Sequence, residues 1–448
     1  MGNVNRLIKK SPGIFQKMYY ENVPFSKRYG KPFVSQYKFL MESVTWSRDQ
    51  LLSYQEEEFR RLITHCFDNV PYYRDLFNNR SLVPSDFRTV KDLELLPYLT
   101  KKLIRENYAS LIATNMKGSK FHSVKTSGST GEKLVFSITD DVFKKEAAYV
   151  LRAYQLHGAS LYDKPSIWLR RFVPANRESP LWYTDYELKR IYMSAYHLND
   201  RTINSYIEAM DSTKATTLVG YPSSAFILAL LCERNGVRPK FLTKIHVSSE
   251  MMLDEWRTKI IDALGIVPVA HYGAIEKVSF MHQLESSTEY FQNFEYGINE
   301  FIPNRFEQHD LVATGFLNYY MPFLRYRTED SVSITDGMEG SVRILSINGR
   351  SSDILIAKDG SYLPGVNFYS WIDKSIPGVA MFQLIQTSLE SVTMNFVASE
   401  KFTESTIMDI ENGLRARLGN LKISIIQKSE IERNGESGKI RCIINETL

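Results

Sequence analysis

Hydrophobic residues recur at helical spacing in the first quarter of the chain. Over residues 47–70 the apolar side chains fall three and four positions apart, and Pro71 ends the run. The same spacing predicts a second helix over 90–113. Residues 1–45 contain three prolines, which exclude one long helix there. The N-terminal portion, residues 1–115, is therefore predicted to be helical.

From residue 121 onward, short β-rich runs alternate with amphipathic helices. The predicted strands are 121–125, 134–138, 166–169, 190–196, 216–219, 244–247 and 267–272. The predicted helices between them are 140–157, 225–235 and 254–264. Strands that are separated by helices indicate a largely parallel sheet with helices on both faces.

Residues 291–347 carry consecutive strand signals with few helical ones, which predicts an antiparallel β subdomain. After residue 349 the pattern restarts as a small α+β unit with one clear helix at 404–418. The sequence therefore predicts an α/β protein with a large domain over 1–349 and a small α+β domain over 350–448. The large domain would comprise a helical, an α/β and an antiparallel portion: 1–115, 121–290 and 291–349.

Composition narrows the class of protein. The chain has 448 residues, of which 43% are hydrophobic and 12% aromatic, so it can bury a large core and is not disordered or collagen-like. Its 55 basic and 51 acidic residues give a net charge of +4, which argues against a dedicated nucleic-acid binder. Cys66, Cys232 and Cys442 lie far apart, which excludes a disulfide scaffold and argues against a structural zinc site. No apolar run approaches the ~20 residues of a membrane span, so we expect a cytoplasmic protein.

The first segment that could bind a ligand combines two glycines with four hydroxyl side chains between two predicted strands. Its residues are Thr126, Ser127, Gly128, Ser129, Thr130 and Gly131. Glycines let the backbone approach a phosphate closely, and amides and hydroxyls donate hydrogen bonds to its oxygens. No Gly-Lys-Ser/Thr follows, so this is not a Walker loop. Taken alone, a Ser/Gly-rich hairpin loop is the simpler interpretation.

The second segment, 271–276, follows a predicted strand. Ligands of doubly wound sheets bind just beyond the carboxyl ends of strands. There Glu276 can hold Mg²⁺ against a nucleotide phosphate, and Tyr272 can stack on a base. Taken alone, this segment is better explained as an ordinary strand-to-loop turn with a solvated acid.

Three further segments, 325–330, 349–353 and 437–441, place charged residues at predicted strand ends or in a polar loop. An aspartate at a strand end can accept two hydrogen bonds from a ribose diol, and an arginine can lie over a phosphate. Each of these segments, taken alone, is adequately explained as a solvated, charged strand end.

Together and in this order, the five segments resemble the adenylate-forming superfamily of acyl- and aryl-CoA synthetases. That superfamily has a TSGSTG loop, a YGxTE-like segment, YRTGD, GRxxD and a late Gly-Lys in the same sequence. More narrowly, the chain resembles the phenylacetate–CoA ligase-like family, in the branch encoded with capsular polysaccharide genes (CapK-type proteins). The segments that carry this closer resemblance span nearly the whole chain: 62–77, 93–107, 220–223, 248–250 and 314–330.

The resemblance implies an ATP- and Mg²⁺-dependent ligase. A carboxylate would attack the α-phosphorus of ATP and release pyrophosphate, and a thiol or amine would then take the acyl group from the adenylate. Glu276 would bind Mg²⁺, and Lys439 would reach from a mobile C-terminal domain, hinged at Ser352, to the attacking carboxylate and the α-phosphate. The nucleotide would be held by Thr126, Ser127, Gly128, Ser129, Thr130, Gly131, Ser249, Glu250, Tyr272, Gly273, Asp330 and Arg350. The pocket for the acyl substrate would be lined by Tyr196, His197, Gly220, Tyr221 and Ala274.

Four positions depart from the family pattern. Lys133-Leu134 follow the phosphate loop where many members have Pro-Lys, and Ile275 replaces a Thr or Ser before the acidic residue. Glu329 replaces the glycine of YRTGD, and Ser352 stands where the hinge usually has Asp or Lys. These changes indicate a specialised enzyme or a weakened one.

Two acceptors and one other class of function stay open. Coenzyme A is the default acceptor of the superfamily, whereas the capsule-linked branch implies amide formation with an amine-bearing sugar. The different class is a non-catalytic nucleotide-binding partner protein, which Ile275, Glu329 and Ser352 motivate. His197 could point into the acyl pocket, or it could be an edge histidine without a role.

The N-terminal forty residues predict a peripheral contact with the inner face of the cytoplasmic membrane. They hold eight basic residues against one acid, Glu21, and aromatic residues are interleaved with them. Basic charge attracts anionic lipid by about 1 kcal/mol per residue near the surface, and aromatics sit at the interface. The alternative is that the aromatics pack on the large domain and the lysines are only solvated.

We therefore expect reversible binding to anionic liposomes that weakens steeply as salt is added, because surface charge is screened. Co-sedimentation at low ionic strength measures it, with a chain that lacks residues 1–40 as the control. Absence of binding, or binding that survives the deletion, would contradict this prediction.

Overall fold

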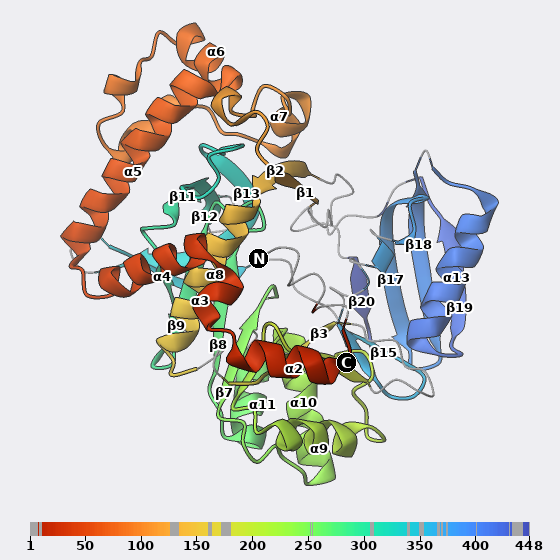
Figure 1. Cartoon of the computed structure of the whole chain (residues 1–448). Helices are drawn as coiled ribbons and strands as arrows, with labels where there is room; N and C mark the ends of the chain where they lie inside the picture. Colours follow the sequence, from red (N-terminus) through yellow and green to blue (C-terminus); the bar gives the residue numbers. More distant parts are fainter. Residues whose placement is uncertain are drawn as a thin grey trace. The chain divides into compact units, whose positions relative to one another are not determined.

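A computed structural model describes most of the chain (Figure 1). The described residues are 8, 11–125, 134–159, 164–171, 181–250, 252, 254–304, 309–337, 341–348, 354–364, 368, 371–372, 375–399, 401–429, 431 and 442–447. The chain divides into two compact units, each built from several segments. Unit 1 comprises Met1–Thr126, Leu134–Leu161 and Val269–Gly349. Unit 2 comprises Ser127–Lys133, Tyr162–Pro268 and Arg350–Leu448.

Unit 1 begins with helices whose starts and ends follow from local sequence. They are α2 (Gly13–Asn22), α3 (Phe25–Tyr29), α4 (Lys31–Ser43), α5 (Arg48–Asn69) and α6 (Pro71–Asn79). Ser47 and Gln50 form a capping box at the start of α5. Pro71 lies in the first turn of α6, where a missing amide hydrogen costs nothing. The predicted helix over 47–70 is thus confirmed.

The predicted helix over 90–113 is wrong. The structure has a 3₁₀ turn, η2 (Val90–Leu95), and a short helix, α7 (Lys101–Glu106), with Leu99 extended between them. The Leu99 amide donates to the Arg325 carbonyl at 2.9 Å, and the Arg327 amide donates to the Leu99 carbonyl at 3.0 Å. Because Pro97 cannot continue a helix and this backbone pairing replaces helical hydrogen bonds, the apolar spacing is interrupted here.

The sheet strands of unit 1 are antiparallel. In spatial order they run β11-β12-β13-β14-β10-β9-β8. Their bounds are β8 (Pro268–Gly273), β9 (Phe280–Leu284), β10 (Ser287–Gln292), β11 (Gly297–Pro303), β12 (His309–Gly315), β13 (Tyr326–Asp336) and β14 (Val342–Asn348). A separate hairpin pairs β1 (Phe121–Lys125) with β2 (Val135–Thr139), and α8 (Asp140–Gln155) follows it. The antiparallel subdomain predicted for 291–349 is part of this arrangement.

A buried ion pair ties the N-terminal helices to this sheet region. Arg152 of α8 donates to Glu295 at 2.6 Å, and both side chains are at most 6% exposed. The Ser43 hydroxyl, at the end of α4, donates to the same carboxylate at 2.5 Å. Burial opposes ionisation, but the Arg152 guanidinium outweighs it and holds the pKa of Glu295 below its usual value. Removal of one partner would leave a buried charge uncompensated, which costs about 3–5 kcal/mol.

Unit 2 contains the parallel sheet that the alternating pattern predicts. Its strands run in the order β7-β6-β3-β5-β4, with β4 antiparallel to β5 and the others parallel. The strands are β3 (Ser166–Arg171), β4 (Trp182–Asp185), β5 (Arg190–Ser194), β6 (Thr217–Gly220) and β7 (Lys244–Ser248). The helices among them are α9 (Ile203–Thr213), α10 (Pro222–Asn235) and α11 (Asp254–Leu264). Of these elements, β4 and α9 lie outside the ranges that the sequence pattern predicts.

The C-terminal segment of unit 2 forms a second, smaller α+β layer. Strands β17 (Val379–Ser388), β18 (Ser391–Ala398), β19 (Lys422–Gln427) and β20 (Ile443–Asn445) pair in the order β19-β18-β17-β20. Helix α13 (Glu404–Leu418) lies beside this sheet (Figure 1), and its Ile410, Leu414 and Leu418 are fully buried in the same core as Met394 and Phe396. The α/β fold class and the small C-terminal α+β unit are thereby confirmed, whereas the predicted boundary at residue 349 stays a prediction. No helix among the described residues is long and apolar enough to cross a membrane.

His282 of β9 makes the stability of unit 1 dependent on pH. Burial and the nearby Arg152 guanidinium lower the pKa of His282 to about 3. The unfolded chain would bind a proton at this side chain near pH 6.5, but the folded chain would not. The free energy of unfolding should therefore fall by about 1.4 kcal/mol per pH unit as pH is lowered from 6.5 toward 4.

Urea unfolding of the wild type and of His282→Asn at pH 8, 6 and 5 measures this contribution. The amide nitrogen of Asn293 lies 3.0 Å from Nδ1 of His282, and the substituted carboxamide can keep that contact. The loss of stability at pH 8 reports packing alone, and the stability difference between the two proteins should shrink as the pH falls. A difference that stays constant with pH would contradict the assigned cause.

Candidate active site

The carboxylate of Glu276 is buried just beyond the end of β8. Its Oε1 accepts a hydrogen bond from the Tyr326 hydroxyl at 2.8 Å, and the residue is 8% exposed. Burial raises the pKa of this carboxyl above its usual value. The turn that holds it is closed by backbone hydrogen bonds, one of them from the Lys277 amide to the Ala274 carbonyl at 2.9 Å. The residue that the sequence predicts as a metal ligand is therefore a carboxylate that is largely removed from water.

Asp330 lies on the same strand as Tyr326 and accepts a hydrogen bond from the Tyr272 hydroxyl at 2.7 Å. Burial raises the pKa of Tyr272, and the negative charge of Asp330 raises it further, so this tyrosine stays a donor. Two predicted site residues that are 58 positions apart in the chain are thus brought into direct contact. The Tyr272 hydroxyl is therefore fixed by Asp330, while stacking of its ring on a base stays a prediction.

Lys101 is a candidate site residue that the sequence analysis missed. Its side chain is 8% exposed and forms an ion pair with Glu329, beside Asp330. The charge of Lys101 also acts on Glu276, whose pKa it lowers against the larger effect of burial. The sequence offered one signal for it: Lys101 lies inside segment 93–107, which supports the family resemblance. None of the five ordered segments includes this lysine, so no role was assigned to it.

In unit 2, Arg170 joins two of the predicted substrate and nucleotide segments. Its guanidinium lies 5.1 Å from the centre of the Tyr221 ring and donates to the Ser249 hydroxyl at 3.1 Å. Tyr221 caps α10 directly after β6, and Ser249 follows β7, so both lie at carboxyl ends of parallel strands. Gly220 at the end of β6 is constrained, because a Cβ there would lie 3.2 Å from the Leu169 carbonyl. Arg170, in β3, therefore contacts residues of both segments and is a candidate site residue that the sequence analysis does not name.

Tyr196 and His197, predicted to line the acyl pocket, lie where the C-terminal segment packs. Tyr196 is 5% exposed and belongs to the hydrophobic core that contains α13, and burial raises the pKa of its hydroxyl. Nδ1 of His197 lies 2.6 Å from the Ser194 hydroxyl, and burial lowers the pKa of this imidazole. Nearby, the Asn199 amide donates to Asp359 at 3.0 Å and to Ser361 at 2.8 Å.

Nine of the predicted residues cannot be placed. Those of the phosphate loop, Thr126–Gly131, together with Arg350, Ser352 and Lys439, lie outside the described residues. The side chain of Glu250 is half-buried directly after Ser249. Described parts of the site therefore form two groups, one around Glu276 and Asp330 in unit 1 and one around Arg170 in unit 2.

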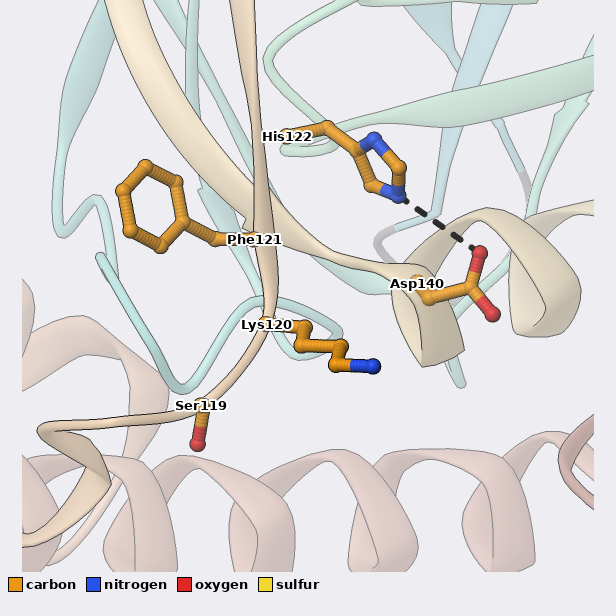
Figure 2. Close-up of a pocket in the computed structure, with 5 residues that line it drawn as sticks. All are labelled: Ser119, Lys120, Phe121, His122 and Asp140. Atoms are coloured by element: carbon orange, nitrogen blue, oxygen red, sulfur yellow. Dashed lines mark ion pairs between the residues drawn. The ribbon is translucent and has the colours of Figure 1, made fainter.

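The hairpin that leads into and out of segment 126–133 borders a hollow of about 600 Å³ (Figure 2). Its lining residues are Ser119, Lys120, Phe121, His122 and Asp140. Figure 2 shows His122 facing Asp140 at the start of α8, with Phe121 pointing to the other side of β1. Nε2 of His122 lies 3.6 Å from the carboxylate, and Lys144 forms a second ion pair with it at 2.5 Å. These contacts anchor strand β1 to α8 and so support one end of the hairpin.

Comparison with known proteins gives three findings. Residues 355–446 match the CapK C-terminal domain. Protein CapK of Staphylococcus aureus is 24% identical over 457 aligned positions, which cover 99% of each chain. The phenylacetate-coenzyme A ligase of Pseudomonas putida is 25% identical over 71% of this chain and 75% of its own.

Among solved structures, a 2-hydroxyisobutyryl-CoA ligase, crystallised with 2-HIB-AMP and CoA, superposes with a TM-score of 0.57. The alignment covers 90% of this chain and 91% of that one at 15% identity, so it establishes a shared fold. The fold is that of the adenylate-forming ligases. The resemblance to CapK-type proteins of the phenylacetate–CoA ligase-like family, predicted from the ordered motifs, is therefore confirmed along the whole chain.

Proposed function

We propose that this protein is an ATP-dependent ligase that activates a carboxylate as its acyl-adenylate and passes the acyl group to an acceptor in surface polysaccharide assembly. The observation that carries the proposal is the pair of contacts from β13, Tyr326 to Glu276 and Asp330 to Tyr272. These contacts join the YGxTE-like and YRTGD-like segments, which the resemblance assigns to metal and ribose. Full-length similarity to Protein CapK supports the capsule pathway.

The carboxylate of Glu276 is suited to the role of a Mg²⁺ ligand. Mg²⁺ usually takes one or two carboxylates and completes its shell with water and substrate phosphates. A single buried carboxylate meets that requirement, and no cluster of three metal-ligating side chains occurs among the described residues. When bound, the ion would neutralise charge on the polyphosphate.

The protein's own residues would bind and orient the reactants. Asp330, held by Tyr272, would accept hydrogen bonds from the ribose hydroxyls. Lys439 would bring its ammonium to the carboxylate and the α-phosphate, where two negative groups must approach one another. Within unit 2, Asn199 is hydrogen-bonded to Asp359 and Ser361 of the C-terminal segment, so a movement of that whole segment that delivers Lys439 would have to release these contacts.

For the acceptor, an amine-bearing sugar is the first candidate, because the similarity to Protein CapK extends over 99% of the chain; the phenylacetate-coenzyme A ligases of P. putida and Thermus thermophilus match over 71% and 90% of it. Coenzyme A is the second candidate. A non-catalytic nucleotide-binding partner protein is the alternative of a different class.

Weak contact with the cytoplasmic membrane is part of the proposal. Ile14, Phe15 and Met18 of α2 are at least 58% exposed, and Lys17 lies among them. In contrast Tyr20, Phe33 and Leu40 are fully buried, so only part of the N-terminal aromatic set is available to a lipid surface.

Carboxylate-dependent exchange between ATP and pyrophosphate tests the activity. We expect exchange with the wild type and loss by orders of magnitude with Lys439→Ala, since one charge at the transition state is worth about 3–4 kcal/mol. Supplied acyl-adenylate should still be discharged by this variant. Equal loss of both half-reactions would contradict the role of Lys439.

MgATP binding without exchange for any acid in a panel of aryl, alkyl and hydroxy acids would favour the non-catalytic alternative. Discharge of the adenylate by an amino sugar, but not by coenzyme A, would support the amide ligase; the reverse result would select the acid–thiol ligase.

Asp330→Ala should raise the KM for ATP much more than the KM for the carboxylate, because it removes hydrogen bonds to ribose in a partly buried site. Tyr272→Phe is the matched control: it deletes the bond to Asp330 but keeps the carboxylate, so its effect on the KM for ATP should be smaller. Steady-state kinetics measure both. If Asp330→Ala leaves the KM for ATP unchanged, Asp330 does not bind the ribose and only ends a run of charged residues on its strand.

A further inference from the structure

Glu329 occupies a backbone conformation that favours glycine. Its φ is +67°, in the left-handed region, where a side chain costs about 1–2 kcal/mol. The cause is a bulge: between the pairs Asp310–Ser331 and Val312–Arg327, one residue of β12 faces three of β13. The superfamily pattern YRTGD has glycine at this position. A glutamate that tolerates the strain here must provide something that glycine cannot.

The carboxylate of Glu329 pairs with the ammonium of Lys101. Lys101 has little freedom, because it is the first residue of α7 and Leu99, two residues before it, is held by two backbone hydrogen bonds to Arg325 and Arg327. Its side chain is 8% exposed, whereas that of Glu329 is 44% exposed. The cation is therefore fixed and desolvated, and the anion is the partner that can turn away into solvent.

The surroundings of this pair are those of the proposed nucleotide site. Asp330 follows Glu329 directly, and Glu276 lies within the electrostatic reach of Lys101. A desolvated ammonium needs a counterion, and removal of its partner is unfavourable until another anion arrives. ATP brings several negative charges to this place if the proposed function holds.

We propose that Glu329 is an internal counterion that competes with the phosphates of ATP for Lys101 and thereby weakens ATP binding. The inference rests on the proposed function. In the free protein, Glu329 satisfies the Lys101 ammonium; when ATP enters, its phosphates replace the carboxylate, which turns toward solvent. Part of the binding energy is then used to break the internal ion pair. Glu329 thus sets the ATP concentration at which the enzyme works, without touching the reacting atoms.

Two substitutions separate the charge from the backbone strain. Glu329→Gln removes the charge and keeps the strain, and Glu329→Gly removes both. Both variants should bind MgATP about three- to tenfold more tightly in isothermal titration calorimetry, since the ion pair they delete is half-exposed. Glu329→Gly should in addition be more stable than Glu329→Gln. The KM for ATP should fall in step with the dissociation constant, and the KM for the carboxylate should not change.

Asp310→Asn is the matched control. Asp310 lies on the neighbouring strand β12, is 42% exposed and pairs with Arg327 at 3.7 Å, so this variant removes an equally exposed negative charge. It should leave MgATP binding within twofold of the wild type. In a Lys101→Met background, Glu329→Gln should no longer tighten MgATP binding, because the ammonium for which Glu329 and the phosphates compete is then absent.

The outcomes distinguish this inference from the proposed function. A wild type that neither binds MgATP nor catalyses exchange would overturn the proposed function and this inference with it. A wild type that does both, with Glu329→Gln binding MgATP no more tightly, would overturn the inference alone. Equal tightening by Asp310→Asn would also overturn it, since the effect would then be one of overall charge.

Discussion

Burial of the Glu276 carboxylate is the constraint on which the arrangement of the site in unit 1 depends. A carboxylate that is removed from water is unfavourable unless a donor or a cation faces it. The Tyr326 hydroxyl and the Lys101 ammonium meet this need, one by a hydrogen bond and the other through its charge. Both are placed by one piece of backbone, because Leu99, two residues before Lys101, pairs with Arg325 and Arg327 on either side of Tyr326.

Strand β13 accordingly carries several site contacts within five residues. Tyr326 reaches Glu276, Glu329 reaches Lys101, and Asp330 reaches Tyr272. A regular strand would send alternate side chains to opposite faces. The bulge at Thr328 breaks that alternation, and the Thr328 hydroxyl closes it by donating to the Leu311 carbonyl at 2.8 Å. Glu329 and Asp330 can therefore both be used next to the same site.

Backbone strain gathers near these groups and is held by polar side-chain contacts. Four non-glycine residues of the described chain with positive φ lie at the site segments: Ser249, Lys277, Arg325 and Glu329. Ser249 is bonded by Arg170, and the other three each form an ion pair, with Glu146, Glu300 and Lys101 respectively. Such strain persists only where the surroundings over-determine the conformation. The contacts supply that determination, so the loss of any of them should relax the local backbone.

Much of the fold was predictable because its signals are local. Helix α11 and helix α13 have the predicted bounds, since their apolar spacing is uninterrupted and their flanks carry turn residues. The failure over 90–113 has the opposite cause: Leu99 looks helical by spacing, but its partner in a β-bridge is Tyr326, more than two hundred positions away. A pairing at that separation leaves no trace in a local pattern.

The order of the five motifs was enough to predict the resemblance to CapK-type proteins and the fold of adenylate-forming ligases, and it nominated Glu276, Tyr272 and Asp330 as candidate site residues. Only the tertiary structure revealed that Tyr272 donates to Asp330, that Arg170 contacts Ser249 and Lys101 pairs with Glu329, and that Glu329 fills a left-handed position with a charged side chain. The physical reason is that the sequence gives the type and order of the residues. The hydrogen-bond partner, the burial and the φ of each residue are set by strands that meet only after the chain has folded.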